Sequence, residues 1–395
     1  MNKIIINLCF SIIFIHLSYG QNFYFKTGTP STRNYYTEIK YEDVNGKIII
    51  PVTIEGVVYR FLFDTGAPNL ISKDLWKKIA SKSVKIISVT DANQKKQRME
   101  LASIPRLTIG TLSFKNSSAL VFEGENNLVF ECFNIDGIIG SNLLRKSIIQ
   151  IQSKNKLLIL TNDSKKLNLK KEHASKLLLV GKQSSPYISI KLIGEDSGTE
   201  SLLFDTGASG FYDLCKTNYN VLKEKKIAKI LSKSYGSSSV GMFGIADKSE
   251  QYLLKIPQLK VNNHILKNVV TTTGDDDNSR IGSDILKYGT VTLNFSKEVF
   301  YFQPFQSVDN LDEKLLGFTP TIENNKLVVG FIWDELLKEK IEFGDEIIEV
   351  NGIDVQNQEI CNFINKKSIF KNSDVLNIVF KNKNGEITKM ELEKI

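Results

Sequence analysis

Hydrophobic residues in this chain fall mainly into short runs separated by turn residues. Runs rich in Val, Ile, Leu and Phe, with polar positions between them, are typical of strands. Lys47–Ile54 and Val57–Phe63 flank Glu55-Gly56, which predicts a hairpin. Further predicted strands are Ser147–Ile151, Lys156–Leu160, Tyr187–Ile193, Ser201–Phe204, Thr290–Phe295 and Glu298–Phe302, followed near the C-terminus by Lys326–Ile332, Val375–Lys381 and Thr388–Glu393. The pattern therefore predicts a mainly β protein.

Helical patterns are few and short. We predict helices at Lys73–Ser81, Leu143–Lys146 and Val221–Ser232. Asn162–Ser185 is rich in Lys and Ser and is predicted to be a linker between two β-rich regions.

Three blocks of sequence recur in the same order along the chain. Phe61–Ala67 returns as Leu202–Ala208, and both contain Phe-Asp-Thr-Gly-Ala. The other block pairs are Ile104–Leu107 with Ile256–Leu259, and Ile139–Leu144 with Ile281–Leu286. The offset between copies changes slightly from block to block, as loop insertions would produce. The repeat indicates two copies of one structural unit.

The composition narrows the classes of function. The chain has 395 residues, which suits two or three domains, and its 42% hydrophobic and 24% charged residues argue against disordered and polytopic membrane proteins. It has three histidines (His16, His173 and His264) and four dispersed cysteines, so we expect no structural zinc site and no cofactor. Acid–base chemistry is then expected from carboxylates.

The net charge of +7 does not indicate a nucleic-acid partner. The lysine clusters Lys165–Lys176 and Lys223–Lys233 are broken by acidic residues and lack interleaved aromatic residues, so we interpret them as solvated faces. The acidic run Asp275–Asn278 does not have the spacing of an EF-hand and is also expected to be a solvated loop.

The N-terminus has the pattern of a signal peptide. Lys3 precedes the apolar run Ile4–Leu17, and Ser18-Tyr19-Gly20 supplies small residues at the expected cleavage point. We predict a signal peptide at 1–20, a leading arm at 21–43 and export to the periplasm or the exterior. An uncleaved anchor is the alternative, although the run is short for a bilayer, and we expect no span in the mature chain.

Export would leave three cysteines in the mature chain, at Cys132, Cys215 and Cys361. This odd and widely spaced set is not a disulfide framework. One disulfide remains open, and the sequence does not assign its partners.

Asp64 and Asp205 are the candidate catalytic residues. Each follows three apolar residues, so a buried strand would deliver the carboxylate to a turn at its end. A single Asp-Thr-Gly is weak and could be a structural turn, but two copies within a repeat are specific. Two carboxylates in contact share one proton, so one can take a proton from water while the other donates to a carbonyl oxygen.

On these residues the sequence resembles retropepsin-type aspartic proteases, in a fused two-copy form like pepsin. Proton sharing within a carboxylate pair is the known behaviour of that family's dyad and is not a new expectation. The resemblance includes Asp136–Gly140 and Ser279–Gly282, where the family has an apolar-apolar-Gly element behind each catalytic loop. Arg280 departs from it, because an apolar residue is expected there.

The resemblance implies a fold that is mainly β and bilobal, with two pseudo-symmetric barrel-like lobes. The implied boundaries are lobe 1 at 44–161, a linker at 162–185 and lobe 2 at 186–303.

The resemblance also implies roles for neighbouring residues. Thr65, Gly66, Thr206 and Gly207 would shape the active-site loops. An extended polypeptide substrate would lie in the cleft between the lobes, beneath a hairpin flap. The flap candidates are Ile86–Leu101 and Tyr235–Leu254, and the second, which is richer in Gly and Ser, is the better candidate for a mobile lid.

Ala67 and Ala208 predict a less acidic pH optimum than that of pepsin. A hydroxyl at these positions could hydrogen-bond the carboxylate and lower its pKa, whereas Ala cannot.

Residues 304–395 resemble a PDZ domain, a small β-sandwich with helices. The most specific stretch is Phe343–Gly352, and Leu316-Gly317-Phe318 matches the loop that holds a peptide carboxylate. A C-terminal peptide would add as a strand beside Phe318–Thr321, against a predicted helix at Asn357–Lys366. Trp333-Asp334-Glu335 stands where these domains usually have Pro-Gly-Ser, so the groove is expected to be altered.

The leading hypothesis is an exported, monomeric aspartic endopeptidase whose PDZ domain binds a peptide or regulates access. The alternative is a catalytically inactive exported protein that binds peptides through the cleft and the PDZ domain. A third arrangement would pair each copy with a copy from another chain.

Overall fold

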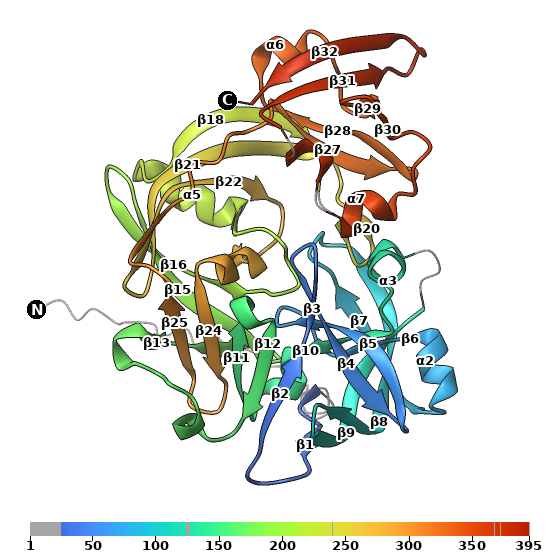
Figure 1. Ribbon diagram of the computed structural model, residues 1–395, viewed down its shortest axis with the longest axis vertical. Helices are drawn as coiled ribbons and strands as arrows, with labels where there is room; N and C mark the ends of the chain where they lie inside the picture. The colour runs from blue at the N-terminus through green and yellow to red at the C-terminus, as the bar shows by residue number, and fades with distance from the viewer. Residues whose placement is uncertain (1–24, 124–126, 239, 367, 372, 395) are drawn as a thin grey trace, which may run out of the picture.

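The computed structural model describes residues 25–394 apart from 124–126, 239, 367 and 372. The predicted signal peptide and the start of the leading arm lie outside the described residues. Strands dominate the chain, so the predicted mainly β fold class is confirmed. Figure 1 shows two β-rich lobes side by side and a smaller module above them.

The first lobe is built on a sheet in the order β1-β9-β6-β10-β5-β4-β8-β7, with β3 paired to β4. Its strands are β1 (Thr29–Pro30), β3 (Glu42–Val44), β4 (Lys47–Ile54), β5 (Val57–Asp64), β6 (Leu70–Ser72), β7 (Lys82–Thr90), β8 (Lys96–Ile109), β9 (Leu112–Phe122) and β10 (Gly137–Gly140). Its helices are α2 (Lys73–Lys78), α3 (Leu128–Phe133) and α4 (Ser141–Leu144).

The second lobe repeats this plan in the order β14-β15-β16-β23-β17-β22-β21-β18, with β26 paired to β22. Its strands are β14 (Leu178–Val180), β15 (Ser185–Ile193), β16 (Ser197–Phe204), β17 (Tyr212–Cys215), β18 (Lys229–Gly236), β21 (Ser249–Val261), β22 (His264–Gly274), β23 (Arg280–Ile281) and β26 (Val308–Asn310). Helix α5 spans Lys216–Glu224, and a small hairpin is formed by β19 (Val240–Gly241) and β20 (Gly244–Ile245).

A third sheet joins the two lobes, in the order β13-β25-β24-β11-β12-β2. Its strands are β2 (Tyr36–Lys40), β11 (Ile148–Gln152), β12 (Leu157–Thr161), β13 (Ala174–Lys176), β24 (Gly289–Asn294) and β25 (Val299–Pro304). The two copies meet where β11 pairs antiparallel with β24, and Gln150 Nε2 donates to Thr292 Oγ1 there. One continuous hydrophobic cluster runs through both lobes, so they share a core.

The C-terminal module, residues 315–394, has its own sheet in the order β27-β28-β29-β31-β32. Its strands are β27 (Phe318–Glu323), β28 (Lys326–Ile332), β29 (Glu346–Val350), β30 (Ile353–Asp354), β31 (Val375–Lys381) and β32 (Ile387–Glu393), and its helices are α6 (Glu335–Lys338) and α7 (Cys361–Asn365). A separate hydrophobic cluster fills it, which includes Phe318 and Phe380.

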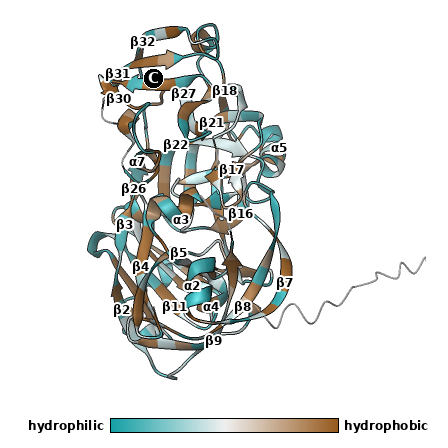
Figure 2. Ribbon diagram, turned by 90° about the vertical axis from the view of Figure 1, so that its right-hand side faces the viewer, coloured by the Kyte–Doolittle hydropathy of each residue, from teal (hydrophilic) through white to brown (hydrophobic). Residues whose placement is uncertain are grey.

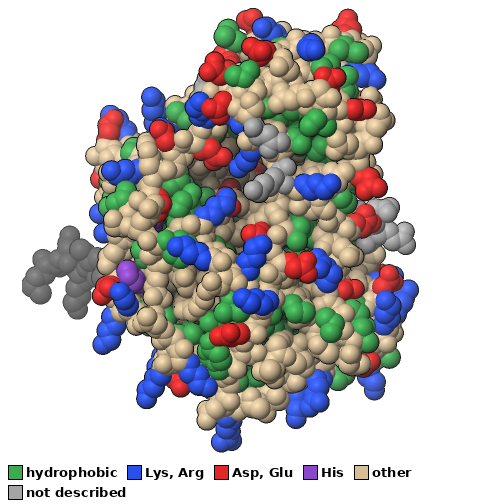
Figure 3. Space-filling view, viewed as in Figure 1, with side chains coloured by type: hydrophobic (Ala, Val, Ile, Leu, Met, Phe, Trp, Pro, Cys, Tyr) green, Lys and Arg blue, Asp and Glu red, His purple; other side chains and the backbone are tan. Residues whose placement is uncertain are grey.

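Hydrophobic burial accounts for these elements. Figure 2 shows hydrophobic residues concentrated along the strands, while helix α2 is largely hydrophilic. Strand β15 alternates buried and partly exposed residues, the pattern of a strand with one covered face. Charged residues are spread over the surface, and Figure 3 shows Lys and Arg scattered over the visible face.

Several predicted boundaries are wrong. The helix predicted at Val221–Ser232 ends at Glu224, because the chain from Lys229 onward pairs with β21 instead. Helix α7 begins only at Cys361 rather than at Asn357. Helix α3 was not predicted, and Asn127 caps it by accepting hydrogen bonds from the backbone N–H groups of Val129 and Phe130.

The predicted linker and leading arm are both structured. Residues 162–185 supply β13, which pairs with β25, and β14, which pairs with β15. The described part of the leading arm supplies β1, β2 and β3, which join the first sheet and the interlobe sheet. The Lys- and Ser-rich composition of residues 162–185 does not prevent β13 and β14 from pairing, because each lies at the edge of its sheet.

A disulfide between Cys132 and Cys361 connects α3 of the first lobe to α7 of the C-terminal module. Cys215 is buried and forms no disulfide. Within the described residues, no helix is long and apolar enough to cross a membrane.

Candidate active site

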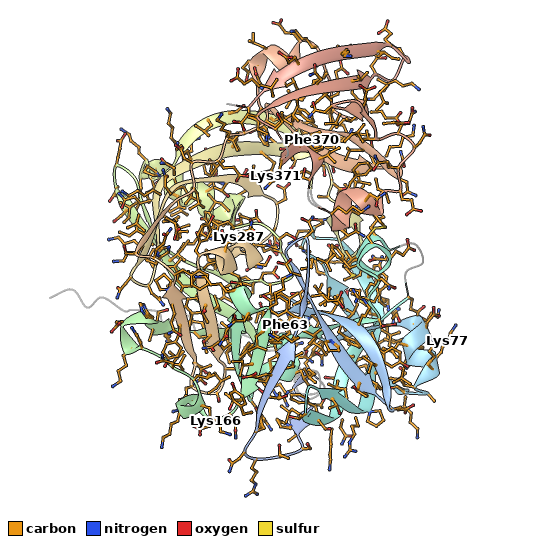
Figure 4. The ribbon with its side chains drawn as sticks, in the orientation of Figure 1. Phe63, Lys77, Lys166, Lys287, Phe370 and Lys371 are labelled. Carbon is orange, nitrogen blue, oxygen red and sulfur yellow. A yellow bond between two sulfur atoms is a disulfide. The ribbon has the colours of Figure 1, made fainter. Side chains whose placement is uncertain are left out.

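The two aspartates lie at equivalent places, each at the end of a buried strand. Asp64 ends β5 after Phe63, which is fully buried and labelled in Figure 4. Asp205 follows Phe204 at the end of β16, and Phe204 is also fully buried. A short parallel strand supports each of them, β10 beside β5 and β23 beside β16.

The two Asp-Thr-Gly loops bind each other reciprocally. Thr65 Oγ1 donates to Phe204 O at 2.6 Å and accepts from Thr206 N at 3.1 Å. Thr206 Oγ1 donates to Phe63 O at 2.8 Å and accepts from Thr65 N at 3.1 Å. Both threonines are fully buried, so each hydroxyl satisfies two backbone groups that water does not reach.

The glycines allow the carboxylates to meet. A Cβ on Gly66 would lie 2.6 Å from the carboxyl carbon of Asp205, and a Cβ on Gly207 would overlap the carboxyl group of Asp64. Each glycine thus leaves space for the aspartate of the opposite lobe. A side chain at either position would meet the opposing carboxylate.

The backbone holds one oxygen of each carboxylate. Asp64 Oδ1 accepts from Gly66 N at 2.8 Å and Ala67 N at 3.1 Å, and Asp205 Oδ1 accepts from Gly207 N at 2.9 Å. Burial and the neighbouring Asp205 carboxylate raise the pKa of Asp64 to about 8. The protonated form of Asp64 is therefore favoured near neutral pH.

Arg280 binds the Asp205 carboxylate directly. Its Nη1 lies 3.0 Å from Asp205 Oδ2, and its Nη2 forms an ion pair with Asp276. The Arg280 side chain is 14% exposed and that of Asp205 is 8% exposed, so water screens the pair poorly. The acidic run Asp275–Asn278 is therefore not simply a solvated loop, because Asp276 belongs to this site.

Lys47 reaches the same site from the first lobe. Its Nζ donates to Gly207 O, across the interface between the two loops. Burial lowers the pKa of Lys47, while the Asp205 and Asp64 charges oppose this shift. Burial has the opposite effect on Asp213 of β17, an acid: it raises the pKa of this carboxyl, while the positive charge of Arg280 lowers it.

Gln183 extends the site from the segment predicted as a linker. Its Nε2 donates to Gly66 O at 2.9 Å, and its own backbone oxygen accepts from Ser141 Oγ at 3.0 Å. The segment between the lobes therefore supports the first Asp-Thr-Gly loop.

The aspartates face a cleft of about 1660 Å³. Both flap candidates line it, the β7–β8 hairpin and the hairpin from β18 to β21. Their tips touch, because Phe243 N donates to Asp91 Oδ2 at 2.9 Å and Asn93 Nδ2 donates to Gly244 O at 2.8 Å. The two hairpins therefore meet over the cleft, and the sequence-based preference for one of them finds no support in this arrangement.

The C-terminal module holds the second hairpin. Ser237 N donates to Gly330 O at 3.2 Å, and Ile332 N donates to Ser234 Oγ at 3.0 Å. Trp333 stacks on Phe331 and packs in the cluster around Leu253 of β21. Trp333, noted in the sequence for its unusual place, thus lies at the contact with the second lobe.

A small groove of about 150 Å³ lies between β27 and the segment containing α7. Phe370, labelled in Figure 4, lines it together with Val240 of the second-lobe hairpin. Pro320 lies in β27, which is an edge strand of its sheet. Because proline has no N–H, the backbone of β27 offers no hydrogen-bond donor at this position to a peptide added along the edge.

The predicted carboxylate loop, Leu316-Gly317-Phe318, leads into β27. Gly317 O accepts from Trp333 N at 2.8 Å and Asp334 N at 3.0 Å, and Phe318 is buried in the module's core. None of these three residues lines the small groove.

Sequence reasoning missed Lys47, Asp213, Gln183 and Asp276 as site residues. Only Arg280 left a signal, as a charged residue where the repeat has Ile138 in the first copy. A long side chain that reaches across a loop has no signature in hydrophobic periodicity, and Lys47 is such a case.

Comparison with known proteins gives one family match. Residues 50–143 match the model of a family described as aspartyl protease, which covers about a quarter of the chain and includes Asp64 but not Asp205. No curated protein matches the sequence.

Solved structures with similar folds include proteases and a seed globulin. The aspartic proteinase from Irpex lacteus is 12% identical, with 69% of this chain and 98% of that chain covered and a TM-score of 0.42. The retropepsin-like aspartic protease from Rickettsia conorii is 21% identical, covering 34% and 94% at a TM-score of 0.24. Conglutin gamma, a basic 7S globulin from lupine seeds, is 12% identical, covering 70% and 96% at a TM-score of 0.41.

Proposed function

We propose that the chain is an aspartic endopeptidase whose dyad is Asp64 and Asp205. The observation that carries this proposal is the reciprocal hydrogen bonding of Thr65 and Thr206, which supports a fixed contact between the two carboxylates. The match of the first lobe to the aspartyl protease family is consistent with it.

The chemistry uses one proton shared by two carboxylates. Asp205 takes a proton from water as the water oxygen forms a bond to the substrate carbonyl carbon, and Asp64 donates its proton to the carbonyl oxygen. In the second step Asp205 passes the acquired proton to the amide nitrogen while the C–N bond breaks, and Asp64 takes a proton back from the hydroxyl. One water is consumed, and both carboxyl groups return to their initial states.

The substrate class follows from the cleft. A groove of this volume beneath two touching hairpins favours an extended polypeptide over a folded protein, with main-chain hydrogen bonds to the hairpins. The positive net charge adds a general attraction for acidic chains but selects no sequence.

Cleavage of a disordered protein tests the proposal. Wild type should cleave reduced, alkylated casein, and Asp64→Asn should lose activity by roughly a hundredfold or more, because acid–base groups contribute about 10²–10⁴ in rate. Asp74→Asn, an exposed carboxylate in α2, serves as the matched control and should retain activity. Unchanged cleavage by Asp64→Asn would contradict the assignment of the dyad.

A second function, peptide binding without turnover, is favoured by one observation. Arg280 binds Asp205 Oδ2, one of the two oxygens of the carboxylate proposed as the base. A wild-type protein that binds a pepstatin-type inhibitor but leaves casein intact from about pH 3 to pH 9 would support this function instead.

We further propose that the C-terminal module acts as a PDZ-like regulator of access to the cleft. Support comes from its hydrogen bonds to the second hairpin and from the Cys132–Cys361 disulfide to the first lobe. Peptides with an apolar C-terminus should bind the groove beside Val240 and change kcat/KM. Binding that leaves kcat/KM unchanged would contradict a regulatory role.

Export and a monomeric state complete the proposal. A disulfide between distant segments fits an oxidising compartment. Mass spectrometry should show that the exported protein begins at Gln21. Sedimentation should give the mass of one chain, which is 44.6 kDa before removal of the signal peptide. An uncleaved N-terminus or an obligate dimer would overturn these two points.

A further inference from the structure

The two halves of the repeat differ at one position next to the dyad. Ile138 on β10 lies opposite Leu62, and Arg280 on β23 lies opposite Leu203. Ile138 is 1% exposed and belongs to a hydrophobic cluster, whereas Arg280 extends toward the carboxylate of Asp205. The same strand position therefore carries a core residue in one lobe and a cation at the dyad in the other.

The Arg280 guanidinium is held in place from both sides. Nη1 contacts Asp205 Oδ2 and Nη2 contacts Asp276, so the planar group bridges the second Asp-Thr-Gly loop and the loop before β23. Arginine does not lose its proton in proteins, so this positive charge persists at every working pH. The first lobe places no arginine in contact with Asp64 among the described ion pairs.

We propose that Arg280 is a positioning residue that assigns the dyad its two roles, keeping Asp205 as the carboxylate that receives the proton from water and leaving Asp64 as the proton donor. This inference rests on the proposed protease function. It goes beyond that function, because a symmetric pair of Asp-Thr-Gly loops does not by itself distinguish acid from base.

The surroundings of both carboxylates favour this assignment. Asp205 is 6% exposed, and a charge so deeply buried requires an opposite charge, which Arg280 supplies. In its own loop Asp64 accepts from the backbone N–H groups of Gly66 and Ala67, and burial and Asp205 raise its pKa. The protonated form of Asp64 is thus favoured, while Arg280 places a positive charge against Asp205.

The other charged groups facing Asp205 do not remove this asymmetry. Lys47 from β4 interacts with both carboxylates and more strongly with Asp205, so it adds to the asymmetry and does not oppose it. Asp213 from β17 would repel a charge on Asp205, but burial raises the pKa of Asp213 and favours its neutral form. Asp276 competes with Asp205 for Arg280, so a change at Asp276 also alters the interaction between Arg280 and Asp205.

The contact also leaves room for catalysis. A carboxylate oxygen accepts two hydrogen bonds, so Asp205 Oδ2 retains a lone pair for water while it binds Nη1. The step is the proton transfer from water to Asp205 described above, and Arg280 itself neither gains nor loses a proton.

The pH dependence of kcat/KM for dye-quenched casein tests the proposal, using wild type, Arg280→Met and Arg280→Lys. Removal of the positive charge should move the acidic limb of the profile up by about 1–3 pH units, the usual effect of one adjacent charge on a carboxyl group. Arg280→Lys should return the limb most of the way toward wild type. Arg106→Met removes an exposed arginine far from these contacts and should leave the limb unmoved.

A second variant keeps the test independent of folding defects in Arg280→Met. Asp276→Asn frees Arg280 for Asp205 alone, so the acidic limb should move in the opposite direction, toward lower pH. Active variants whose acidic limbs coincide with that of wild type would overturn the role of Arg280 while the protease assignment stands. Faster cleavage by Arg280→Met with an unmoved limb would also overturn it and would identify the ion pair as a block. A wild type that cleaves at no pH would overturn both proposals.

Discussion

The two Asp-Thr-Gly loops share one backbone design but have different charged surroundings. In both, a threonine hydroxyl bonds the opposite loop and a glycine makes space for the opposite carboxylate. Around the first loop the supporting strand places Ile138 in a hydrophobic cluster, whereas around the second it places Arg280 against the aspartate. The geometry of the loops is therefore common to both copies while the electrostatics differ.

Geometry and charge can thus be separated in a duplicated site. Substitutions that affect the shared geometry should have equal effects in both lobes. Substitutions that affect charge should have unequal effects, and the sign of the difference should follow Arg280.

The largest expected effect comes from filling the space between the carboxylates. Gly66→Ala and Gly207→Ala each place a Cβ inside contact distance of the opposite aspartate, so each should reduce casein cleavage below about a hundredth of wild type. Gly210→Ala, whose Cβ would have only an ordinary contact at 3.7 Å, is the control. If one glycine tolerates alanine and the other does not, the loops are not geometrically equivalent.

Loss of a threonine hydroxyl should destabilise the protein equally from either side. Thr65→Val and Thr206→Val each leave one buried backbone N–H and one buried C=O unpaired, at a cost of about 1–3 kcal/mol for each group. Urea denaturation measures the free energy of unfolding, and the Ser variants should restore most of it. A marked difference between the two Val variants would weaken the reciprocal arrangement.

Neutralising the two aspartates should change stability in opposite directions. The pKa of Asp64 is raised to about 8 in the folded protein, so its contribution to stability is full below about pH 4 and is lost as pH rises toward 8. Asp64→Asn should therefore become more stable than wild type across that range. Asp205→Asn leaves Arg280 with Asp276 alone and should be less stable by about 1–3 kcal/mol at pH 7.

The same urea titrations, repeated at several pH values, check this prediction. Asp163→Asn removes a carboxylate that caps a short helical turn outside the dyad, and it serves as the control. Equal stability changes for the two dyad variants would mean that Arg280 does not distinguish the carboxylates.

The smallest effect is expected at the hairpin tips. Asn93→Ala removes the hydrogen bond to Gly244 O, an exposed contact worth about 1 kcal/mol, so KM should change by about fivefold or less while kcat is retained. Asn384→Ala, in a turn of the C-terminal module, is the control. A large fall in kcat would instead place this contact in the catalytic step.

The repeat allowed the features that both copies share, the two aspartates and their loops, to be predicted from the sequence. Two buried strands that end in Asp-Thr-Gly, within paired blocks in one order, identify Asp64 and Asp205 because strand ends are encoded locally. The mainly β class followed from the same short hydrophobic runs.

The features in which the two copies differ could not be predicted, because they depend on side-chain direction and on how the lobes pack. Arg280 was visible as a departure from an apolar pattern, but a pattern does not show where a long side chain points. Lys47 sits at the start of an ordinary strand, and its contact with Gly207 depends on how the lobes pack. The disulfide likewise joins Cys132 and Cys361 across 229 residues, a pairing that depends on the docking of the C-terminal module.

The proposed function requires a single chain to form one dyad from its own two loops. Asp64→Asn and Asp205→Asn, assayed separately and then mixed in equal amounts, probe this requirement with casein as the substrate. We expect wild type to cleave with a specific activity independent of protein concentration, each variant to be inactive, and the mixture to stay inactive. Activity restored by mixing would refute the single-chain dyad, because only loops from different chains could then rebuild an intact pair.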